Sequence, residues 1–379
     1  ASSVKVSEYT SNSQVSYYYG KDGNFYHYYY TGTYGKKANL AMTRVGYTPS
    51  YLKNQTKYYS YDGHYFYTTY QKMIDDYKAN TRKNSINASK PYYNYYQYLN
   101  HRSTSAYSQK DVDRYLKDTL ALRHTITGFY DKDNYIHDVL TQSLLLQAEA
   151  AFFQYQNQFG ANALMMLSLA ENESALGRSY LAYTRNNLFG HAAYDSAVEE
   201  NASRYASTSG SVYSHALHYL SNAYMNPSQF QFHGGFFGNK AGGMNVSYAS
   251  DPYWGEKAAQ YFYEMDHAMG DRDHNRYALG IVKNTGVSIY KNADKKSDAV
   301  YSIKKGYDAA LILLEKLEGS KKQMTDVMKR CTSDEEALKE LERVFHGNVD
   351  KKEQPDEAFN INALSMMKTL RRQFPEEFR

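Results

Sequence analysis

The sequence of 379 residues contains one cysteine, Cys331, and one tryptophan, Trp254. A single cysteine cannot form an intrachain disulfide, and the chain has no Cys-x-x-Cys pair for a zinc site. No apolar run approaches the roughly 18 residues that a membrane-spanning helix needs, so we expect no membrane span. A P-loop, a dinucleotide-binding glycine motif, a Gly-x-Ser-x-Gly elbow and a His-Glu-x-x-His motif are also missing. We therefore expect no cofactor and no metal.

Tyrosine is the residue in greatest excess, with 43 in the chain, and 24 of these lie in residues 1–110. The same segment has 14 Lys and Arg against 5 Asp and Glu, a net charge of +9, so the remainder sums to about −5 given the total of +4. A basic and aromatic surface suits sugar rings and anionic polymers. Nucleic acid is the alternative partner, but the segment has no nucleic-acid motif and Tyr far outnumbers Arg, so we do not expect it.

The N-terminal part contains two similar ten-residue segments. KDGNFYHYYY (21–30) and YDGHYFYTTY (61–70) place Asp-Gly at the same offset, forty residues apart, and Asp-Gly between aromatic residues is a hairpin signal. Residues 1–75 are therefore predicted to form small β modules, either glycan-binding or purely structural. Residues 76–107, polar and with a cluster of tyrosines, are predicted to be a connector. The start, ASSVKVSEY, has no signal-peptide layout, and we expect a mature or trimmed N-terminus.

Helical patterns begin at residue 108. Ser108 and Asp111 resemble a capping box, a second helix is predicted at about 133–158, and another helical stretch lies in 195–233. The run FGANALMMLSLAEN (159–172) is apolar on most of its surface, which predicts a buried helix that Gly177 helps to stop.

Glu173 lies at the end of this buried helix. A carboxylate there can reach a cleft while apolar groups pack behind it, and such surroundings raise a carboxyl pKa as a general acid requires. The alternative is an ordinary helix-terminal glutamate. Glu171 is the nearest rival acid, but two residues along a helix rotate it some 200° away, so the two cannot face one cleft.

Three further motifs follow Glu173: Asn-Asn-Leu-Phe-Gly (186–190), HAAYDS (191–196) and GNKAGGMNVSYASDPYWGEKAA (238–259). Together with Glu-Ser-x-x-Gly-Arg-Ser, these resemble the glucosaminidases of glycoside hydrolase family 73, especially the LytB-type endo-β-N-acetylglucosaminidases that hydrolyse peptidoglycan. The resemblance covers about residues 108–268.

The resemblance implies a multidomain chain, with a mainly α, lysozyme-like catalytic domain at 108–270. Small all-β modules, Src-homology-like or WW-like, are expected to flank it, at 1–75 and as a bacterial Src-homology-type repeat at 271–306. A Lys/Glu-rich tail, 307–379, is predicted to be helical and is unexpected in this family. It could pack on the enzyme or bind a protein partner.

The resemblance also implies roles for site residues. Glu173 is expected to protonate the leaving oxygen. Many relatives have a second carboxylate where Ser209 stands here, so the second catalytic group is open. The acids that could replace it are Asp195, Glu199, Glu200 and Asp251. Alternatively, the substrate acetamido group attacks the anomeric carbon while Tyr248 orients it.

Substrate contacts are expected from two segments. Asn187, Phe189 and Gly190 are predicted to shape the site, and Tyr253 and Trp254 to stack on sugars, although a single Trp could equally be core packing. Leu176 stands where many relatives have Trp. His215 and His218 lie three residues apart without a third ligand at suitable spacing, so we predict no metal there.

The function expected is cleavage of the β-1,4 bond after N-acetylglucosamine in the wall glycan, for cell separation or wall remodelling. The protein is predicted to be extracellular and associated with the wall of a Gram-positive bacterium, encoded by the bacterium or its phage. The alternatives are a muramidase or lytic transglycosylase with the same helix-end Glu, or a catalytically weak wall-binding or scaffold protein.

Overall fold

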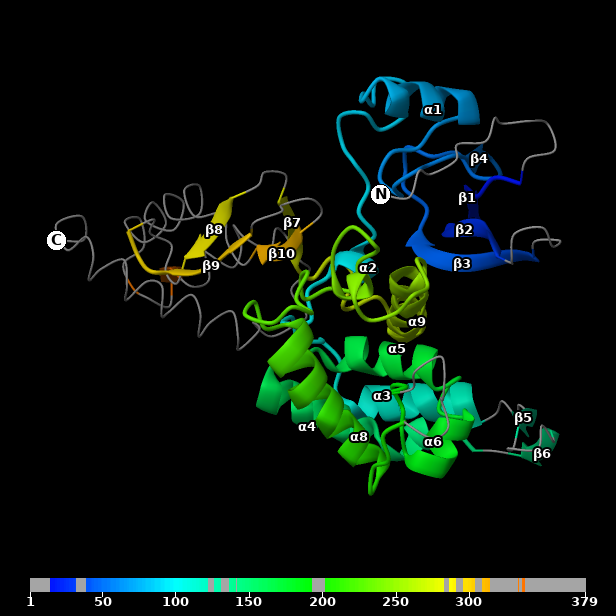
Figure 1. Cartoon of the computed structure of the whole chain (residues 1–379), viewed down its shortest axis with the longest axis vertical. Helices are drawn as coiled ribbons and strands as arrows, with labels where there is room; N and C mark the ends of the chain where they lie inside the picture. Colours follow the sequence, from blue (N-terminus) through cyan, green and yellow to red (C-terminus); the bar gives the residue numbers. More distant parts are fainter. Residues whose placement is uncertain are drawn as a thin grey trace. The chain divides into compact units, whose positions relative to one another are not determined.

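The structure, a computed structural model, describes residues 14–31, 39–121, 126–130, 136–140, 142–192, 202–282, 286–290, 296–303, 309–313, 333 and 336–337. The chain divides into two compact units. One comprises Ala1–Ile289 with Ala299–Ile312, and the other Tyr290–Asp298 with Leu313–Arg379. Most residues of the second unit lie outside the described part of the chain, including the predicted helical tail. The first unit combines helices with small antiparallel sheets (Figure 1).

The N-terminal sheet has four antiparallel strands in the order β3-β2-β1-β4. Its strands are β1 (Tyr17–Lys21), β2 (Asn24–Thr31), β3 (Asn39–Tyr47) and β4 (Lys57–Tyr58). The predicted hairpin at the first Asp-Gly is confirmed: Asp22 and Gly23 join β1 to β2 with φ of 51° and 79°. Positive φ at both central residues matches the right-handed twist of the two strands.

The second Asp-Gly does not form a hairpin between named strands. Its Asp62 carboxylate accepts hydrogen bonds from the backbone N–H groups of His64, at 2.8 Å, and Tyr65, at 3.2 Å. These N–H groups are thereby diverted from strand pairing, and only an isolated bridge, Tyr59 to Tyr67, forms around the turn. The chain then enters a helix, α1 (Tyr70–Lys78), where the sequence pattern predicted strands.

Helices dominate from residue 95 to 269. The elements are α2 (Tyr95–Tyr98), α3 (Gln109–Leu116), η1 (Lys117–Ala121), η2 (Leu144–Gln147), α4 (Glu149–Phe159), α5 (Ala163–Glu173), α6 (Tyr180–Arg185), α8 (Thr208–Ser214), η3 (His215–Tyr224), η4 (Met244–Val246) and α9 (Trp254–Met269). The predicted capping box of Ser108 and Asp111 is confirmed at the start of α3. The helix predicted from residue 133 is wrong at its start, because β5 (Ile126–Tyr130) and β6 (Ile136–Leu140) pair as a hairpin before α4.

Helix α5 is the centre of the helical core. Asn162 caps it by accepting the N–H groups of Leu164 and Met165, and every residue from Ala163 to Glu171 is buried. A helix that is apolar around its whole circumference needs partners on several sides. Helices α4 and α9 pack against it, which confirms the buried helix that the apolar run predicts.

Helix α9 also contacts the N-terminal sheet, so it lies between that sheet and α5 (Figure 1). The buried Glu256 accepts a hydrogen bond from the Tyr18 hydroxyl at 3.2 Å and lies 2.7 Å from His27 Nδ1. Nearer the other end of α9, the Tyr263 hydroxyl donates to Asn24 Oδ1 at 2.6 Å. These contacts tie the β module to the helical core within one unit.

The connector is fastened to α9 through Asp266, whose side chain is fully buried. Its carboxylate accepts hydrogen bonds from the hydroxyls of Tyr96, at 2.9 Å, and Tyr107, at 2.6 Å, and from the backbone N–H of Asp273, at 3.0 Å. A buried carboxylate needs such donors to replace water. The predicted connector is therefore an integral part of the core.

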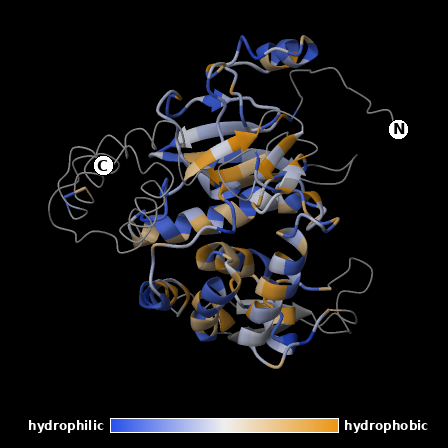
Figure 2. Cartoon of the chain, turned by 90° about the vertical axis from the view of Figure 1, so that its left-hand side faces the viewer, coloured by the Kyte–Doolittle hydropathy of each residue, from blue (hydrophilic) through white to orange (hydrophobic). Residues whose placement is uncertain are grey.

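In the described residues after α9, the chain forms the strands β7 (Ala278–Val282), β8 (Val287–Tyr290), β9 (Ala299–Ile303) and β10 (Ala309–Leu313). They pair as β7 with β10 and β8 with β9, and the hydrophobic strands β7 and β10 are orange in Figure 2. Strand β10 lies beyond residue 306, where we predicted the β segment to end. Among the described helices, none has the length and apolar character needed to cross a membrane.

Replacing Asp266 by Ala is expected to lower the free energy of unfolding by about 3 kcal/mol, because the buried hydroxyls of Tyr96 and Tyr107 lose their acceptor. Asp113 of α3, which is partly exposed and paired with Lys117 of η1, provides the control, and Asp113→Ala should change stability by less than about 0.5 kcal/mol. Urea denaturation followed by circular dichroism measures both. Equal small effects would contradict this role of Asp266.

Candidate functional site

Glu173 is the last residue of α5 and is partly exposed, whereas Glu171 is 1% exposed and lies within the core. The two side chains diverge because two helical residues are separated by about 200° of rotation. The structure therefore presents Glu173, and not Glu171, at the surface end of the helix.

A tight turn follows Glu173 directly. Ala175, Leu176 and Gly177 all have positive φ, of 49°, 60° and 75°. A Cβ on Gly177 would lie 2.6 Å from Ser143 Oγ, and that hydroxyl donates to the Leu176 carbonyl at 2.6 Å. Two non-glycine residues in the left-handed region carry conformational strain, which structures tend to retain at functional sites. The turn thus ends α5 and leaves Glu173 partly exposed.

The Glu173 carboxylate is held by two neutral donors. Trp254 Nε1, on the first residue of α9, donates to Oε1 at 2.5 Å, and Asn172 Nδ2 donates to the same oxygen at 3.1 Å. Burial raises the pKa of Glu173 above its usual value and the charge of Asp251 raises it further, while the two hydrogen bonds lower it. Burial has the largest effect, so Glu173 holds its proton to a higher pH than an exposed glutamate does.

Tyr248 lies in the same group. Its ring stacks on Trp254 with centroids 4.6 Å apart and contacts Tyr224 at 5.1 Å, and its hydroxyl donates to the Phe189 carbonyl at 3.3 Å. Burial and the charge of Glu173 raise its pKa well above the ordinary value, so the phenol stays neutral and can donate a hydrogen bond. Tyr224, which no sequence motif singled out, belongs to this aromatic group.

The Asn-Asn-Leu-Phe-Gly segment brings Gly190 to the carboxylate. A Cβ on Gly190, whose φ is 63°, would lie 3.4 Å from Glu173 Oε2. Asn187 is buried, and its side chain accepts the N–H of His191 and donates to the carbonyls of His191 and Ser203. Gly190 therefore borders the acid, while Asn187 fastens the loop that carries it.

Two buried histidines, His191 and His215, pack against the Asn-Asn-Leu-Phe-Gly loop. The sequence analysis did not assign either of them to the site. Phe189 stacks on His215 at 3.8 Å, and His191 Nε2 lies 3.1 Å from His215 Nδ1. Burial lowers the pKa of His191 to about 3 and that of His215 well below its usual value. Both rings are therefore neutral near pH 7. The position of His191, directly after the Asn-Asn-Leu-Phe-Gly segment, was the sequence feature that could have placed it near the site.

Asp251 is bonded on both carboxylate oxygens: Tyr253 N–H donates to Oδ1 at 2.9 Å and Lys257 Nζ to Oδ2 at 2.5 Å. Tyr253 stacks on Tyr29 of the N-terminal sheet, with centroids 4.0 Å apart. Trp254 is only 3% exposed and belongs to the core. Of the two predicted stacking residues, Tyr253 stacks on the β module and Trp254 donates a hydrogen bond to Glu173.

The remaining candidate residues lie elsewhere. Asp195, Glu199 and Glu200 fall in 193–201, outside the described residues. Ser209, on α8, lies 3.5 Å from the Tyr155 hydroxyl. Within the described ranges, no group of three or more His, Cys, Asp or Glu side chains is arranged to hold a metal ion.

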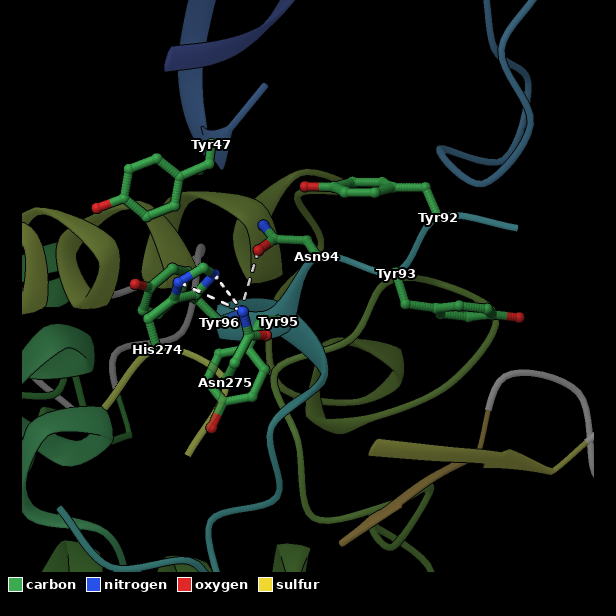
Figure 3. A pocket seen from close by; sticks show the side chains of 9 residues that line it. Tyr47, Tyr92, Tyr93, Asn94, Tyr95, Tyr96, His274 and Asn275 are labelled. Atoms are coloured by element: carbon green, nitrogen blue, oxygen red, sulfur yellow. Dashed lines mark hydrogen bonds between the residues drawn. The ribbon is translucent and has the colours of Figure 1, made fainter. Parts of the chain in front are cut away.

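A small cavity of about 140 Å³ lies near the other end of α9 (Figure 3). Its lining is mainly aromatic and consists of Gly46, Tyr47, Tyr92, Tyr93, Asn94, Tyr95, Tyr96, His274 and Asn275. Asn94 Oδ1 caps α2 by accepting a hydrogen bond from the backbone N–H of Tyr96 at 3.1 Å. Figure 3 draws this bond as the dashed line that starts at the side-chain oxygen of Asn94. The cavity contains none of the residues around Glu173.

Residues 149–267, which contain Glu173, Tyr248 and Trp254, match the glucosaminidase family model, described as mannosyl-glycoprotein endo-beta-N-acetylglucosaminidase. This segment is a glucosaminidase domain. Its family is one of glycoside hydrolases, and the resemblance to glycoside hydrolase family 73 is confirmed for this part of the chain.

Two proteins of Streptococcus pneumoniae, each provisionally named endo-beta-N-acetylglucosaminidase, are 35% identical to this chain over 134 residues. The matching stretch is 35% of this chain but only 20% and 18% of the two relatives. The chain therefore spans about a fifth of the length of the curated relatives that it matches.

Among solved structures, Staphylococcus aureus Autolysin E is similar at 21% identity, covering 46% of this chain and 72% of that chain, with a TM-score of 0.33. A catalytic mutant of Autolysin E in complex with the disaccharide NAG-NAM gives 20% identity, 46% and 73% coverage and the same TM-score. Values this low do not establish a shared fold.

Replacing Trp254 by Phe in the glucosaminidase domain is expected to raise the pKa of Glu173 further, because the carboxylate loses its closest hydrogen-bond donor. Carboxyl ¹³C NMR titration measures this pKa, with Glu173→Gln assigning the signal. Tyr253→Phe removes a hydroxyl that does not contact Glu173 and should leave the pKa unchanged. A pKa that stays the same or falls in Trp254→Phe would refute the assigned hydrogen bond.

Proposed function

We propose that this protein is an endo-β-N-acetylglucosaminidase that hydrolyses the β-1,4 bond after N-acetylglucosamine in peptidoglycan, with Glu173 as general acid. The glucosaminidase domain supports the reaction class. Secretion, action at the cell wall of a Gram-positive bacterium and a lysozyme-like catalytic fold are parts of the same proposal. A role in cell separation or wall remodelling follows from cleavage of the wall glycan.

The observation that carries the assignment is the raised pKa of a carboxyl at an open helix end. Glycosidic cleavage needs a proton on the leaving oxygen as the anomeric centre becomes oxocarbenium-like. Burial raises the pKa of Glu173 and so favours its protonated form, and the Trp254 N–H stabilises the carboxylate that remains after proton transfer. Gly190 leaves open space beside Oε2, the oxygen that Trp254 does not hold.

The second catalytic group is better supplied by the substrate than by Asp251. Both Asp251 oxygens already accept hydrogen bonds within the protein, one from the Tyr253 N–H and the other from the Lys257 ammonium group. We therefore propose that the acetamido oxygen of the bound sugar attacks the anomeric carbon, and that the neutral Tyr248 hydroxyl orients it. Water then opens the cyclic intermediate, with Glu173 acting as base.

Glu173→Gln is expected to lower the release of reducing ends from purified peptidoglycan by about 10²–10⁴-fold, because the amide cannot donate the proton. Wild-type activity should fall as pH rises through the raised pKa of Glu173, since only the protonated form acts. Glu264→Gln, on the surface of α9, is the matched control and should retain activity.

An active Glu173→Gln protein would redirect the search to Glu171, Asp195 and Asp251. Mass spectrometry of the digest identifies the bond. N-acetylglucosamine at the reducing end supports the proposal, whereas reducing-end or anhydro-N-acetylmuramic acid indicates a muramidase or lytic transglycosylase. If wild type releases nothing yet binds peptidoglycan, the chain is a wall-binding protein.

Tyr248→Phe and Asp251→Asn separate the two mechanisms. Substrate assistance predicts that kcat falls at least about tenfold in Tyr248→Phe and changes less in Asp251→Asn. It also predicts inhibition by a thiazoline analogue of the cyclic acetamido intermediate. If Asp251→Asn loses activity as completely as Glu173→Gln and the thiazoline has no effect, Asp251 is the base that activates water.

A further inference from the structure

Helix η3 has an unusual backbone. It is a π-helix of ten residues that continues directly from the α-helical α8. Its wide turns are closed by hydrogen bonds between residues five positions apart, such as the bond from the Met225 N–H to the Leu220 carbonyl at 2.8 Å. Turns of this kind are rare, usually occur singly and are frequent at functional sites. The width of the turn decides which side chains of η3 share one side of the helix.

Three aromatic residues of η3, spaced four and five positions apart, contact residues around the catalytic acid. The pairs are His215 with Phe189, Tyr219 with His191 and Tyr224 with Tyr248, whose ring centroids are 3.8, 3.7 and 5.1 Å apart. In an α-helix the nine positions from His215 to Tyr224 correspond to about 900°, or two and a half turns, so the two side chains would point to opposite sides. The π-helical backbone therefore brings Tyr224 to the side that faces the site.

The backbone beside Tyr248 is held in place by η3 and by the segment that follows it. The Tyr224 hydroxyl donates a long hydrogen bond, of 3.5 Å, to the Ser247 carbonyl. His233 Nε2 lies 3.1 Å from Ser247 Oγ, and the His233 carbonyl accepts the N–H of Gly243 at 2.8 Å. With its backbone fixed in this way, Tyr248 can change the position of its hydroxyl mainly by rotation of its side chain.

Two aromatic rings restrict that rotation. The Tyr248 ring stacks on Trp254 with centroids 4.6 Å apart, and the Tyr224 ring contacts it at 5.1 Å with planes 44° apart. Both tyrosines also pack against the hydrophobic core. Trp254 is itself committed to Glu173 through its N–H. The contact with Tyr224 is therefore independent of the acid and belongs to the positioning of Tyr248.

We infer that Tyr224 is a positioning residue for the hydrolysis, and that the π-helical backbone of η3 serves to bring it to Tyr248. This inference rests on the proposed function, in which the Tyr248 hydroxyl orients the acetamido group of the substrate. Attack by the acetamido oxygen requires close alignment with the anomeric carbon, and a misplacement of about 1 Å can cost about 10²-fold in rate. Without the Tyr224 ring, the side chain of Tyr248 gains rotational freedom and its hydroxyl is less often in place.

The first test measures kcat and KM of the full chain on a soluble tetrasaccharide of the wall glycan. Tyr224→Leu is expected to lower kcat about tenfold and to change KM less than about twofold, because it disturbs alignment and leaves the contacts with bound substrate in place. Tyr224→Phe should keep at least about half of the wild-type kcat, since ring packing contributes more than the long hydroxyl bond. Tyr213→Leu is the matched control. It removes a tyrosine of α8 that is 38% exposed and contacts Tyr155 at 5.4 Å, and it should keep the wild-type kcat.

A double-mutant cycle distinguishes positioning from general loosening of the domain. In a Tyr248→Phe background, which lacks the hydroxyl to be positioned, Tyr224→Leu should cause no further loss of kcat. A purely structural role would lower kcat by the same factor in both backgrounds, because the two substitutions would then act independently.

The only tryptophan of the chain, Trp254, reports on Tyr248 directly because the two rings stack. In Tyr224→Leu, the Trp254 emission should shift to longer wavelength and acrylamide should quench it more strongly, since Tyr248 covers the indole less well. Tyr224→Phe and Tyr213→Leu should retain the wild-type emission. Circular dichroism verifies folding. If Tyr224→Leu does not fold, Tyr224→Met takes its place, because methionine also lacks a ring and fills irregular gaps.

A folded Tyr224→Leu protein with the wild-type kcat would overturn the inference, and so would an equal loss of kcat in the Tyr248→Phe background. A loss confined to KM would make Tyr224 a substrate contact instead. Failure of the proposed function is recognised separately, by hydrolysis that persists in Glu173→Gln or by full activity of Tyr248→Phe. In that case the Trp254 emission still decides whether Tyr224 holds Tyr248, and an unchanged emission in Tyr224→Leu would refute that contact as well.

Discussion

The structure depends on the burial of three polar side chains of one helix, α9. Trp254, at its start, donates to Glu173; Glu256, in its first turn, binds Tyr18 and His27; Asp266, in its last turn, binds Tyr96 and Tyr107. Each buried group requires its partner, because water cannot replace it. One helix about 24 Å long therefore fixes the acid, the β module and the connector at once.

This arrangement explains why the acid at the end of α5 can be protonated and still well oriented. Burial against the core raises the pKa of Glu173, and the rigid indole N–H of Trp254 supports one carboxylate oxygen. The other oxygen lies beside Gly190, whose missing side chain leaves room. The neutral pair His191 and His215 supports the loop without adding charge that would disturb the acid.

The two faces of the N-terminal sheet differ in how deeply their side chains are buried. Its inward aromatic residues are buried where the sheet packs near α9, and Tyr29 stacks on Tyr253, the residue that precedes this helix. Its outward positions on β1 and β2 carry five tyrosines, which are only partly buried, against two buried tyrosines on the inward side.

The sequence by itself determined the local features: the buried helix α5, the first Asp-Gly hairpin, the capping box at α3 and the prominence of Glu173, because each rests on residues close together in the chain. It did not reveal α1 or the β5–β6 hairpin, where local patterns favoured another element. The sequence also could not identify the hydrogen-bond donor to Glu173. Trp254 is 81 residues away, and its position in the sequence suits a sugar platform and a core residue equally well. Only the tertiary structure decided that it is a buried donor to the acid, because packing α9 on α5 brings the two side chains together and excludes the water that would otherwise solvate them.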